Sequence, residues 1–307
     1  MTSPHGKILV VRGGAIGDFI LTLPAIAALR QQFPGARLEV LGYPHIAQLA
    51  LVGGLVDGVQ PIEARALASF FARGGELDDA FADYFSEFDL IISYLYDPDE
   101  IFRTNIARCS RAQFIQGPHR PDEGKRVHAT KVYLQPLERL AIFDADPVPR
   151  ILLSPLASHF SLRIALHPGS GSEKKNWPEE KWAELLQHLT SSTALDLLLV
   201  GGEAEEERLQ RLAAALPPTR REVAQSLPLA ELARRLRGCT AFVGHDSGIS
   251  HLAAALGVPC LVLWAHTAEE VWRPQCEHLI IVSEPGGVRA TSLERVVREL
   301  SCLLEVR

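Results

Sequence analysis

Several features that mark whole classes of protein are missing from this sequence. No stretch reaches about 18 uninterrupted apolar residues, so nothing in it predicts a membrane-spanning helix. A secretory signal is not expected, because Gly13, Gly14 and Asp18 interrupt the apolar run near the N-terminus and no basic segment precedes it. Strand-like runs are followed by neither G-x-G-x-x-G nor a Walker lysine motif, which argues against dinucleotide redox enzymes and ATPases.

Cysteine is also rare in this sequence, and basic residues are fewer than acidic ones. A formal net charge of -6 gives no general attraction to nucleic acid. The five cysteines form no C-x-x-C pair, which predicts reduced thiols of a cytosolic protein rather than a disulfide framework or a zinc site. They are Cys109, Cys239, Cys260, Cys276 and Cys302.

What is present is the composition and length of a two-domain globular protein. The 307 residues suit two domains of roughly 150 residues each. The stretch 144–160, DADPVPRILLSPLASHF, has three prolines and no helical period, so it is the expected linker. The predicted fold class is α/β, with two doubly wound Rossmann-like domains, residues 1–155 and 156–307, facing each other across a cleft. In this prediction the last helix of the chain can also pack against the first domain.

Alternating strand-like and helix-like segments support this prediction, because they indicate βαβ units and parallel sheets. The expected strands are 8–11, 37–41, 89–93, 114–116, 163–166, 196–200, 241–243 and 259–263. The expected helices are 19–33, 178–189, 205–216, 229–236, 250–256 and 292–304.

The first turn of the second half is rich in groups that suit an anion. It reads HPGSGSEKKNWP, in which the glycines expose backbone N–H groups, Ser170 and Ser172 add hydroxyls, and Lys174 and Lys175 add positive charge. Pro178 suits the first position of the following helix, with acidic residues behind it. The turn is therefore predicted to bind an anion; the alternative is a solvated surface loop.

The next turn, GGE, ends in an acid. At the end of a βα turn, Glu203 is placed to accept hydrogen bonds from both hydroxyls of a ribose. The alternative is that Glu203 only adds to the acidic cluster 205–207, which favours a helix N-terminus.

A third turn lies in FVGHDSGISHLAAALGVP. After the strand, Ser247 and Gly248 lead into a helix whose free N–H groups and dipole favour a diphosphate. Asp246 is expected to cap that helix and fix the turn. His251 lies one turn further on the same face, where the alternative is an ordinary buried histidine.

The first half offers acids instead. RGGAIGD, after the first strand, places Asp18 in a Gly-rich turn, where a carboxylate is a poor neighbour for a phosphate. YDPDE holds a D-x-D pair, Asp97 and Asp99, of the kind that carries a metal on a nucleotide diphosphate. The intervening proline favours a plain turn for that pair.

Four segments together resemble the ADP-heptose:lipopolysaccharide heptosyltransferases, glycosyltransferase family 9. They are GAIGDFILTLPAIAALR, HPGSGSEKKNWPEEKW, VGGEAEEE and FVGHDSGISHLAAALGVPCLVLW, and the likeness covers nearly the whole chain. The resemblance implies the GT-B fold and an inverting transfer of heptose from ADP-heptose to an acidic inner-core acceptor.

The resemblance also implies that the donor nucleotide lies on the second domain. The diphosphate would be met by a lysine and by the D-[TS]-G-x-x-H signature. Leu227 would line the adenine pocket, with ordinary core packing as the alternative. The positions implied for donor binding are Ser170, Gly171, Lys175, Glu203, Leu227, Asp246, Ser247, Gly248 and His251.

Asp18 matches the catalytic aspartate of the family. It would take the proton of the acceptor hydroxyl as that oxygen attacks the anomeric carbon, and a single displacement inverts the configuration. The alternative role, compatible with the first, is an N-cap of the helix from Phe19 onward. Fixed donors around the leaving group make a metal cofactor unnecessary in this mechanism.

The acceptors of the family are anionic glycolipids at the inner membrane face. A local excess of basic residues in the first domain suits such a partner, although surface charges are often only solvating. The expected protein is a cytoplasmic monomer, peripheral on the inner membrane. The candidate acceptor residues are Arg103, Arg120, Lys125 and Arg126.

Two rival functions remain open from the sequence. One is a GT-B transferase or epimerase that uses another nucleotide sugar, such as a UDP-sugar. The other is a sugar-nucleotide-binding protein without catalysis, against which the position of Asp18 argues.

Overall fold

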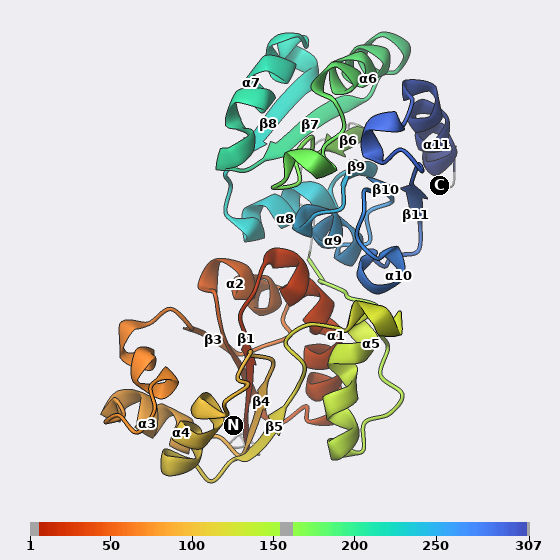
Figure 1. The fold of residues 1–307 in the computed structure, drawn as a ribbon. Helices are drawn as coiled ribbons and strands as arrows, with labels where there is room; N and C mark the ends of the chain where they lie inside the picture. Colours follow the sequence, from red (N-terminus) through yellow and green to blue (C-terminus); the bar gives the residue numbers. More distant parts are fainter. Residues whose placement is uncertain (1–5, 154–161, 306–307) are drawn as a thin grey trace. The chain divides into compact units, whose positions relative to one another are not determined.

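The computed structural model describes residues 6–153 and 162–305 (Figure 1). The chain forms two compact units, Met1–Pro147 and Val148–Arg307, and their division falls inside the stretch where the sequence places a linker. The predicted boundary between residues 155 and 156 lies outside the described residues. Each unit is an α/β fold with one parallel sheet, as predicted.

The first unit is built on a five-stranded sheet with the order β3-β2-β1-β4-β5. The central strand β1 pairs in parallel with β2 on one side and with β4 on the other. It is apolar on both faces because helices cover both faces of the sheet. The strands are β1 (Lys7–Arg12), β2 (Arg37–Gly42), β3 (Gly58–Pro61), β4 (Leu90–Ser93) and β5 (Gln113–Gln116).

Two groups of helices enclose this sheet. On one face α1 packs against α5, and α1 is apolar nearly all round because it is buried on most sides. On the other face α3, α4 and the 3-10 helix η1 (Arg65–Phe71) cover an aromatic core that includes Phe70, Phe85 and Phe102. The α-helices are α1 (Ile16–Gln32), α2 (Pro44–Val52), α3 (Asp79–Ser86), α4 (Ile101–Cys109) and α5 (Ala129–Leu134).

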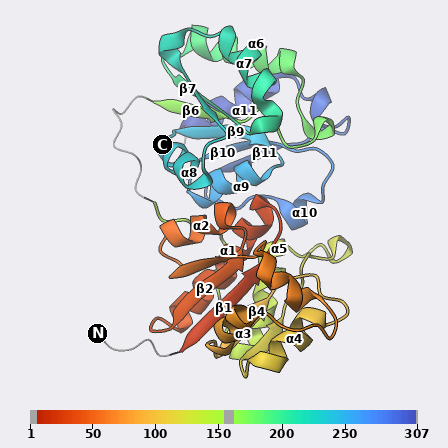
Figure 2. The same ribbon diagram turned by 90° about the vertical axis from the view of Figure 1, so that its left-hand side faces the viewer.

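The second unit has a six-stranded parallel sheet with the order β11-β10-β9-β6-β7-β8. Figure 2 shows β6, β9, β10 and β11 side by side. The strands are β6 (Arg163–Leu166), β7 (Asp196–Gly201), β8 (Arg221–Gln225), β9 (Ala241–His245), β10 (Cys260–Leu263) and β11 (Leu279–Val282).

Helices α6, α7 and α11 cover one face of this second sheet, and α8 and α9 cover the other. The prediction left open that the last helix packs on the first domain. In the structure this helix belongs to the second unit, where Val296, Leu300 and Leu303 join the core. The α-helices are α6 (Glu179–Ser192), α7 (Glu206–Ala214), α8 (Leu229–Arg237), α9 (Gly248–Ala255), α10 (Glu269–Trp272) and α11 (Leu293–Glu305).

Three strands were not predicted, namely β3, β8 and β11, and each is the edge strand of its sheet. Edge strands are only half-buried, and in β3 and β8 polar residues and proline replace the apolar run that marks a central strand. The five cysteines are free thiols, as expected. Within residues 6–153 and 162–305, no helix has both the length and the apolar character needed to cross a membrane.

Both sheets contain a point where the direction of winding reverses. In the first sheet it lies between β1 and β4, and in the second between β6 and β9. In open parallel sheets ligands bind beside the carboxyl ends of the strands at such a point. The turns that follow β1, β6 and β9 are those in which the sequence places its candidate residues.

Candidate functional site

The first unit has a pocket of about 540 Å³ at the carboxyl ends of its strands. The residues that line it follow β1, β2, β3, β4 and β5, so all five strands contribute. Asp18 is among them. The lining residues are Arg12, Gly13, Gly14, Asp18, Tyr43, Ile62, Glu63, Phe71, Tyr94, Leu95, Tyr96, His119 and Arg120. We call this the Asp18 pocket.

Asp18 is held in the first turn of α1. The helix begins at Ile16, with Ala15 as N-cap, so the expectation that Asp18 caps a helix starting at Phe19 is wrong. Its Oδ2 atom instead accepts the backbone N–H of Ala15 at 3.0 Å. Gly14 has a φ of 99°, and a Cβ there would lie 3.0 Å from the same Oδ2 atom. A glycine is therefore needed at this position both for its conformation and for its lack of a side chain.

Arg12, the last residue of β1, lies beneath Asp18 and is only 3% exposed. Its guanidinium donates to the backbone carbonyls of His119 at 2.9 Å, Asp18 at 3.2 Å and Tyr94 at 3.4 Å. It also lies 4.5 Å above the centre of the Tyr133 ring. These contacts tie the turns after β1, β4 and β5 together, so one buried cation organises the wall of the pocket.

The charge of Arg12 is paired with Asp18. One guanidinium nitrogen lies 3.6 Å from Asp18 Oδ1. Burial raises the pKa values of Tyr94 and Tyr133, so neither ring adds a second anion at neutral pH. Sequence reasoning did not select Arg12. The signal was an arginine at the end of an apolar strand, where a buried charge is rare without a partner.

The four candidate acceptor residues lie in two places. Arg120 lines the Asp18 pocket and pairs with Glu123 at 3.0 Å. Arg103 lies on α4, pairs with Glu100 at 2.8 Å and does not line the pocket. Lys125 and Arg126 are exposed in the segment that follows Arg120. The structure therefore brings only Arg120 to Asp18.

The D-x-D acids hold other groups. Asp97 accepts the backbone N–H groups of Phe102 at 3.2 Å and Arg103 at 3.0 Å, at the start of α4. Asp99 pairs with Arg73 at 3.2 Å. The two carboxylates thus stabilise a helix start and an exposed ion pair, which accords with the reading of this segment as a turn.

In the second unit, Lys175 and Asp246 come together at the carboxyl ends of β6 and β9. Lys175 Nζ lies 2.6 Å from Asp246 Oδ2, and Thr267 Oγ1 donates to the same oxygen at 2.5 Å. Asp246 does not cap α9 as expected, because the N-cap of this helix is Ser247. Its carboxylate is used to hold the lysine instead.

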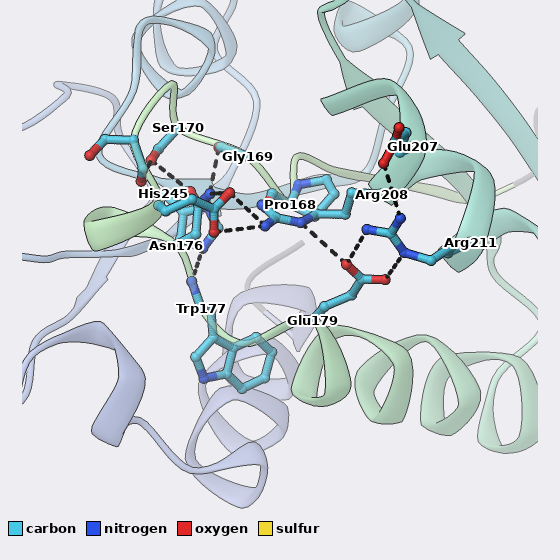
Figure 3. A network of polar contacts seen from close by, with 12 residues as sticks. Pro168, Gly169, Ser170, Asn176, Trp177, Glu179, Glu207, Arg208, Arg211 and His245 are labelled. Carbon is cyan, nitrogen blue, oxygen red and sulfur yellow. Dashed lines mark hydrogen bonds and ion pairs between the residues drawn. The ribbon is translucent and has the colours of Figure 1, made fainter. Parts of the chain in front are cut away.

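Ser170 and Gly171 lie in the turn after β6, which is tied internally (Figure 3). Ser170 Oγ lies 2.7 Å from Asn176 Oδ1 and 3.0 Å from the carbonyl of Ser172, and its single O–H donates to one of these two acceptors at a time. Gly171 is exposed. Pro178 is the N-cap of α6 and Glu179 its first residue, so the proline lies one position before the predicted one.

His245, the last residue of β9, is fully buried and joins two segments (Figure 3). Its Nε2 atom lies 2.8 Å from the backbone N–H of Trp177 and its Nδ1 atom 3.1 Å from the carbonyl of Gly169. Because an N–H only donates and a carbonyl only accepts, the ring is neutral with its proton on Nδ1. Burial lowers the pKa of His245 to about 3, in keeping with this state. Sequence reasoning missed this residue.

Arg208 fixes the same turn from α7 (Figure 3). It donates to the carbonyl of Pro168 at 3.1 Å and pairs with Glu173 at 2.7 Å. Glu179 accepts from Arg211 at 2.7 Å and lies 3.6 Å from Arg208. The turn after β6 is therefore a braced structure and not a loosely solvated loop.

The start of α9 collects polar groups of low exposure. His167 Nδ1 lies 3.4 Å from Ser247 Oγ, and burial lowers the pKa of His167 to about 4. His251 is 6% exposed on the same helix, and Gly248 is its first residue. Lys175 bonds Asp246, two residues before the first residue of this helix, so the lysine lies near the helix start and its free N–H groups.

The remaining two candidates follow β7 and β8. Glu203 is exposed, whereas Glu205 is buried, accepts the N–H of Gly202 at 2.9 Å and packs against Gly169. The two acids therefore differ in burial, and Glu205, not Glu203, makes the contacts with Gly202 and Gly169. Leu227 is half-buried.

A second pocket, of about 500 Å³, lies at the opposite end of the second sheet. Its lining includes Arg237, Gly257 and Glu277, which precede β9, β10 and β11. None of the predicted donor residues lines it. This cavity lies away from the carboxyl ends of the strands, where open parallel sheets bind their ligands.

The chain is similar in sequence and in fold to known glycosyltransferases. Residues 155–298 match the model of "Glycosyltransferase family 9 (heptosyltransferase)". Lipopolysaccharide heptosyltransferase 1 of Pseudomonas aeruginosa is 27% identical over 294 residues, which cover 85% of this chain and 79% of that protein.

Solved structures share the fold over nearly the full chain. A glycosyl transferase family 9 protein from Veillonella parvula has a TM-score of 0.81 at 19% identity and covers 100% of this chain and 99% of that one. The E. coli heptosyltransferase WaaC with ADP has a TM-score of 0.77 at 21% identity, with 97% and 99% covered. The chain thus carries a domain that matches the glycosyltransferase family 9 model, is similar to curated heptosyltransferases, and has the GT-B fold of these solved structures.

Proposed function

We propose that this glycosyltransferase transfers heptose from ADP-heptose to an acidic lipopolysaccharide inner-core acceptor, with inversion at the anomeric carbon. The observation that carries the proposal is the Asp18 pocket, in which a carboxylate stands beside a buried cation at the winding reversal of the first sheet. The relative from Pseudomonas aeruginosa, a lipopolysaccharide heptosyltransferase, supports the choice of sugar and acceptor.

The donor is proposed to bind at the turns of the second unit. Lys175, the serines and the free N–H groups at the start of α9 suit a diphosphate, because each donates to or attracts a negative oxygen. Asp246 keeps Lys175 in place when no anion is bound. The proposed donor residues remain Ser170, Gly171, Lys175, Glu203, Leu227, Asp246, Ser247, Gly248 and His251.

Asp18 is proposed as the general base. Its carboxylate takes the proton of the acceptor hydroxyl while that oxygen forms a bond to the anomeric carbon. The bond between that carbon and the diphosphate oxygen breaks, and ADP leaves with the electron pair. The contact with Arg12 places a positive charge beside this carboxylate. Lys175 and the N–H groups of the second unit stabilise the charge that develops on the diphosphate.

The acceptor is proposed to be an anionic glycolipid, and the protein a monomer that works at the cytoplasmic side of the inner membrane. Arg120 supports this choice because it is a cation in the lining of the Asp18 pocket. For Arg103, Lys125 and Arg126 the proposed role is a weaker, longer-range attraction, since they are exposed and do not line the pocket.

No metal cofactor is proposed. A lysine and backbone donors provide the stabilisation that a divalent cation would otherwise supply. Asp97 and Asp99 should then be dispensable for chemistry, because they hold a helix start and an arginine. Turnover in excess EDTA should equal turnover in magnesium. A complete loss in EDTA that magnesium or manganese restores would overturn this part of the proposal.

Transfer itself is tested by mass spectrometry with ADP-heptose and a defined inner-core acceptor. The acceptor should gain the mass of one heptose, and the product linkage should have the inverted configuration. A thermal-shift panel of nucleotides tests the donor separately. Stabilisation by UDP but not by ADP would contradict the adenine nucleotide and favour a UDP-sugar enzyme.

A further inference from the structure

The Asp18 pocket carries a second feature that the proposed reaction does not explain. Four tyrosine or phenylalanine side chains are exposed within residues 6–153 and 162–305, and three of them line this pocket. They are Tyr43, Phe71 and Tyr96, with exposed fractions of 37%, 45% and 70%. We call these three the aromatic rim. Exposed aromatic rings gathered in one place indicate a surface that binds something.

Each ring of the aromatic rim is supported by a second ring. Phe71 stacks on the buried Phe102, with centroids 5.1 Å apart and an angle of 19° between the planes. One face of Phe71 is thereby covered, and the surface that remains exposed is presented by a ring that cannot easily turn. Such a ring loses little conformational entropy when a ligand lies on it.

The two tyrosines are supported in the same way. Tyr96 lies edge-on to His119, with centroids 4.6 Å apart, and Tyr43 lies 5.9 Å from the ring of His45. The fourth exposed ring, Phe143, is as exposed as Tyr96 at 70%. It does not line the pocket, and no aromatic contact is recorded for it in the described part of the chain. Support by a second ring therefore distinguishes the aromatic rim.

The polar groups beside the rim restrict what the ligand can be. The carboxylate oxygens of Asp18 and Glu63 can accept hydrogen bonds from hydroxyl groups, and Arg120 adds a cation. A ligand that suits this lining has hydroxyls at its edge and an apolar face of C–H groups. A pyranose ring has both, and its C–H face suits the negative face of an aromatic ring.

We propose that the aromatic rim recognises the acceptor sugar, whose pyranose ring lies against Phe71 and Tyr96 while one hydroxyl meets Asp18. This inference rests on the proposed function, since it takes the hydroxyl at Asp18 as the one that is glycosylated. It adds stacking to charge as a source of acceptor affinity. Tyr43 closes the rim beside the turn after β2.

The test is steady-state transfer from ADP-heptose to a delipidated inner-core oligosaccharide. Phe71→Ala and Tyr96→Ala should each raise the acceptor KM by about tenfold, the loss of one well-placed aromatic contact. The donor KM and kcat at saturating acceptor should stay within about twofold. Tyr96→Phe keeps the ring and should restore the acceptor KM. Phe143→Ala, matched in exposure, should leave every constant unchanged.

A second measurement does not depend on turnover. In saturation-transfer NMR without donor, irradiation of aromatic protons should reach the C–H protons of the oligosaccharide in the wild type, and less in Tyr96→Ala. Thermal melting of each variant shows whether it is folded.

The outcomes separate the two proposals. If the wild type transfers heptose and both alanine variants keep the acceptor KM, the aromatic rim proposal is wrong and the proposed function stands. If KM rises only for a lipidated acceptor, the rim binds acyl chains, and if choline competes with the oligosaccharide, it binds an ammonium group; either result overturns the proposal. If no transfer occurs, the proposed function fails, and a wild-type NMR signal that Tyr96→Ala weakens still supports sugar binding at the rim.

Discussion

The carboxyl ends of the two sheets share a topology but differ in how charge is buried. In the first unit a cation, Arg12, is buried beneath a half-buried carboxylate and donates to three carbonyls. In the second, two histidines are buried in neutral form, and the cation Lys175 is the more exposed member of its pair with Asp246. One end is arranged to present a proton acceptor, and the other to present donors and a positive charge.

This difference shows that the chemistry of each end lies in the last residue of its strands and in the turns that follow. β1 ends in Arg12, whereas β9 ends in His245. Both side chains brace neighbouring turns through backbone groups, so both are structural. Only the charged one also acts on a catalytic candidate, through its contact with Asp18.

The largest expected effect is the loss of turnover when Asp18, the carboxylate of the first unit, is replaced. Asp18→Asn keeps the size of the side chain and can still accept the N–H of Ala15, so the fold should persist. Turnover should fall by about 10²–10⁴-fold, the usual contribution of a general base. ADP affinity, measured by calorimetry on the same sample, should barely change. A variant that retains more than about a tenth of wild-type turnover would show that Asp18 is not the base.

The next largest effect is expected from replacing Arg12, the buried cation of the first unit. Arg12→Met removes three hydrogen bonds to backbone carbonyls and should destabilise the protein by about 3 kcal/mol, measured by urea unfolding. Turnover of the folded fraction should fall at least tenfold, because Asp18 loses the group that faces it.

Arg30→Met is the matched control for this change. Arg30 also donates to two carbonyls and a carboxylate, at Leu55, Ala36 and Asp57, but lies away from the pocket. It should lose stability and keep the turnover of its folded fraction. Equal losses of turnover in both variants would mean that Arg12 acts only on the fold.

A smaller effect is expected from the cation of the second unit. Lys175→Ala should weaken ADP binding by roughly 1.5–3 kcal/mol, the range for a charge-assisted hydrogen bond. Lys174 is the matched control, because it is adjacent in sequence and exposed. Lys174→Ala should bind ADP like the wild type. If calorimetry shows an unchanged ADP affinity in Lys175→Ala, the diphosphate does not bind at this turn.

The smallest effect comes from the neutral histidines. Their pKa values, about 4 for His167 and about 3 for His245, lie below the unfolded value, so the unfolded chain binds more protons in acid. Stability is therefore lost as pH falls below about 6.5, by roughly 1–2 kcal/mol for each histidine at pH 5.

His245→Asn separates this contribution. An amide can accept from Trp177 and donate to Gly169 as the neutral ring does, without titrating. The variant should lose less stability between pH 6.5 and pH 5 than the wild type, as followed by urea unfolding. An identical pH dependence would show that His245 is not the group that titrates.

Some of the site was visible in the sequence because it lies in turns with a local signal. Asp18, Lys175 and Ser247 stand in glycine- and serine-rich segments directly after apolar strands, and in a parallel sheet such segments meet at one end. Arg12 and His245 do not lie in such segments; each is a single polar residue at the end of an apolar run, and that feature alone does not show what the side chain contacts. Their roles depend on carbonyl and N–H groups up to 107 residues away, which no local pattern shows.

The sequence by itself determined the α/β class, the parallel sheets and the turns that carry the candidate residues, because apolar periodicity and glycine-rich turns are local properties. Only the tertiary structure decided that Arg12 lies beneath Asp18, that Asp246 holds Lys175 instead of capping a helix, and that three exposed rings share one pocket. The physical reason is that side-chain contacts join segments far apart in the chain. Their partners are set by strand order and by packing, which composition and spacing do not encode.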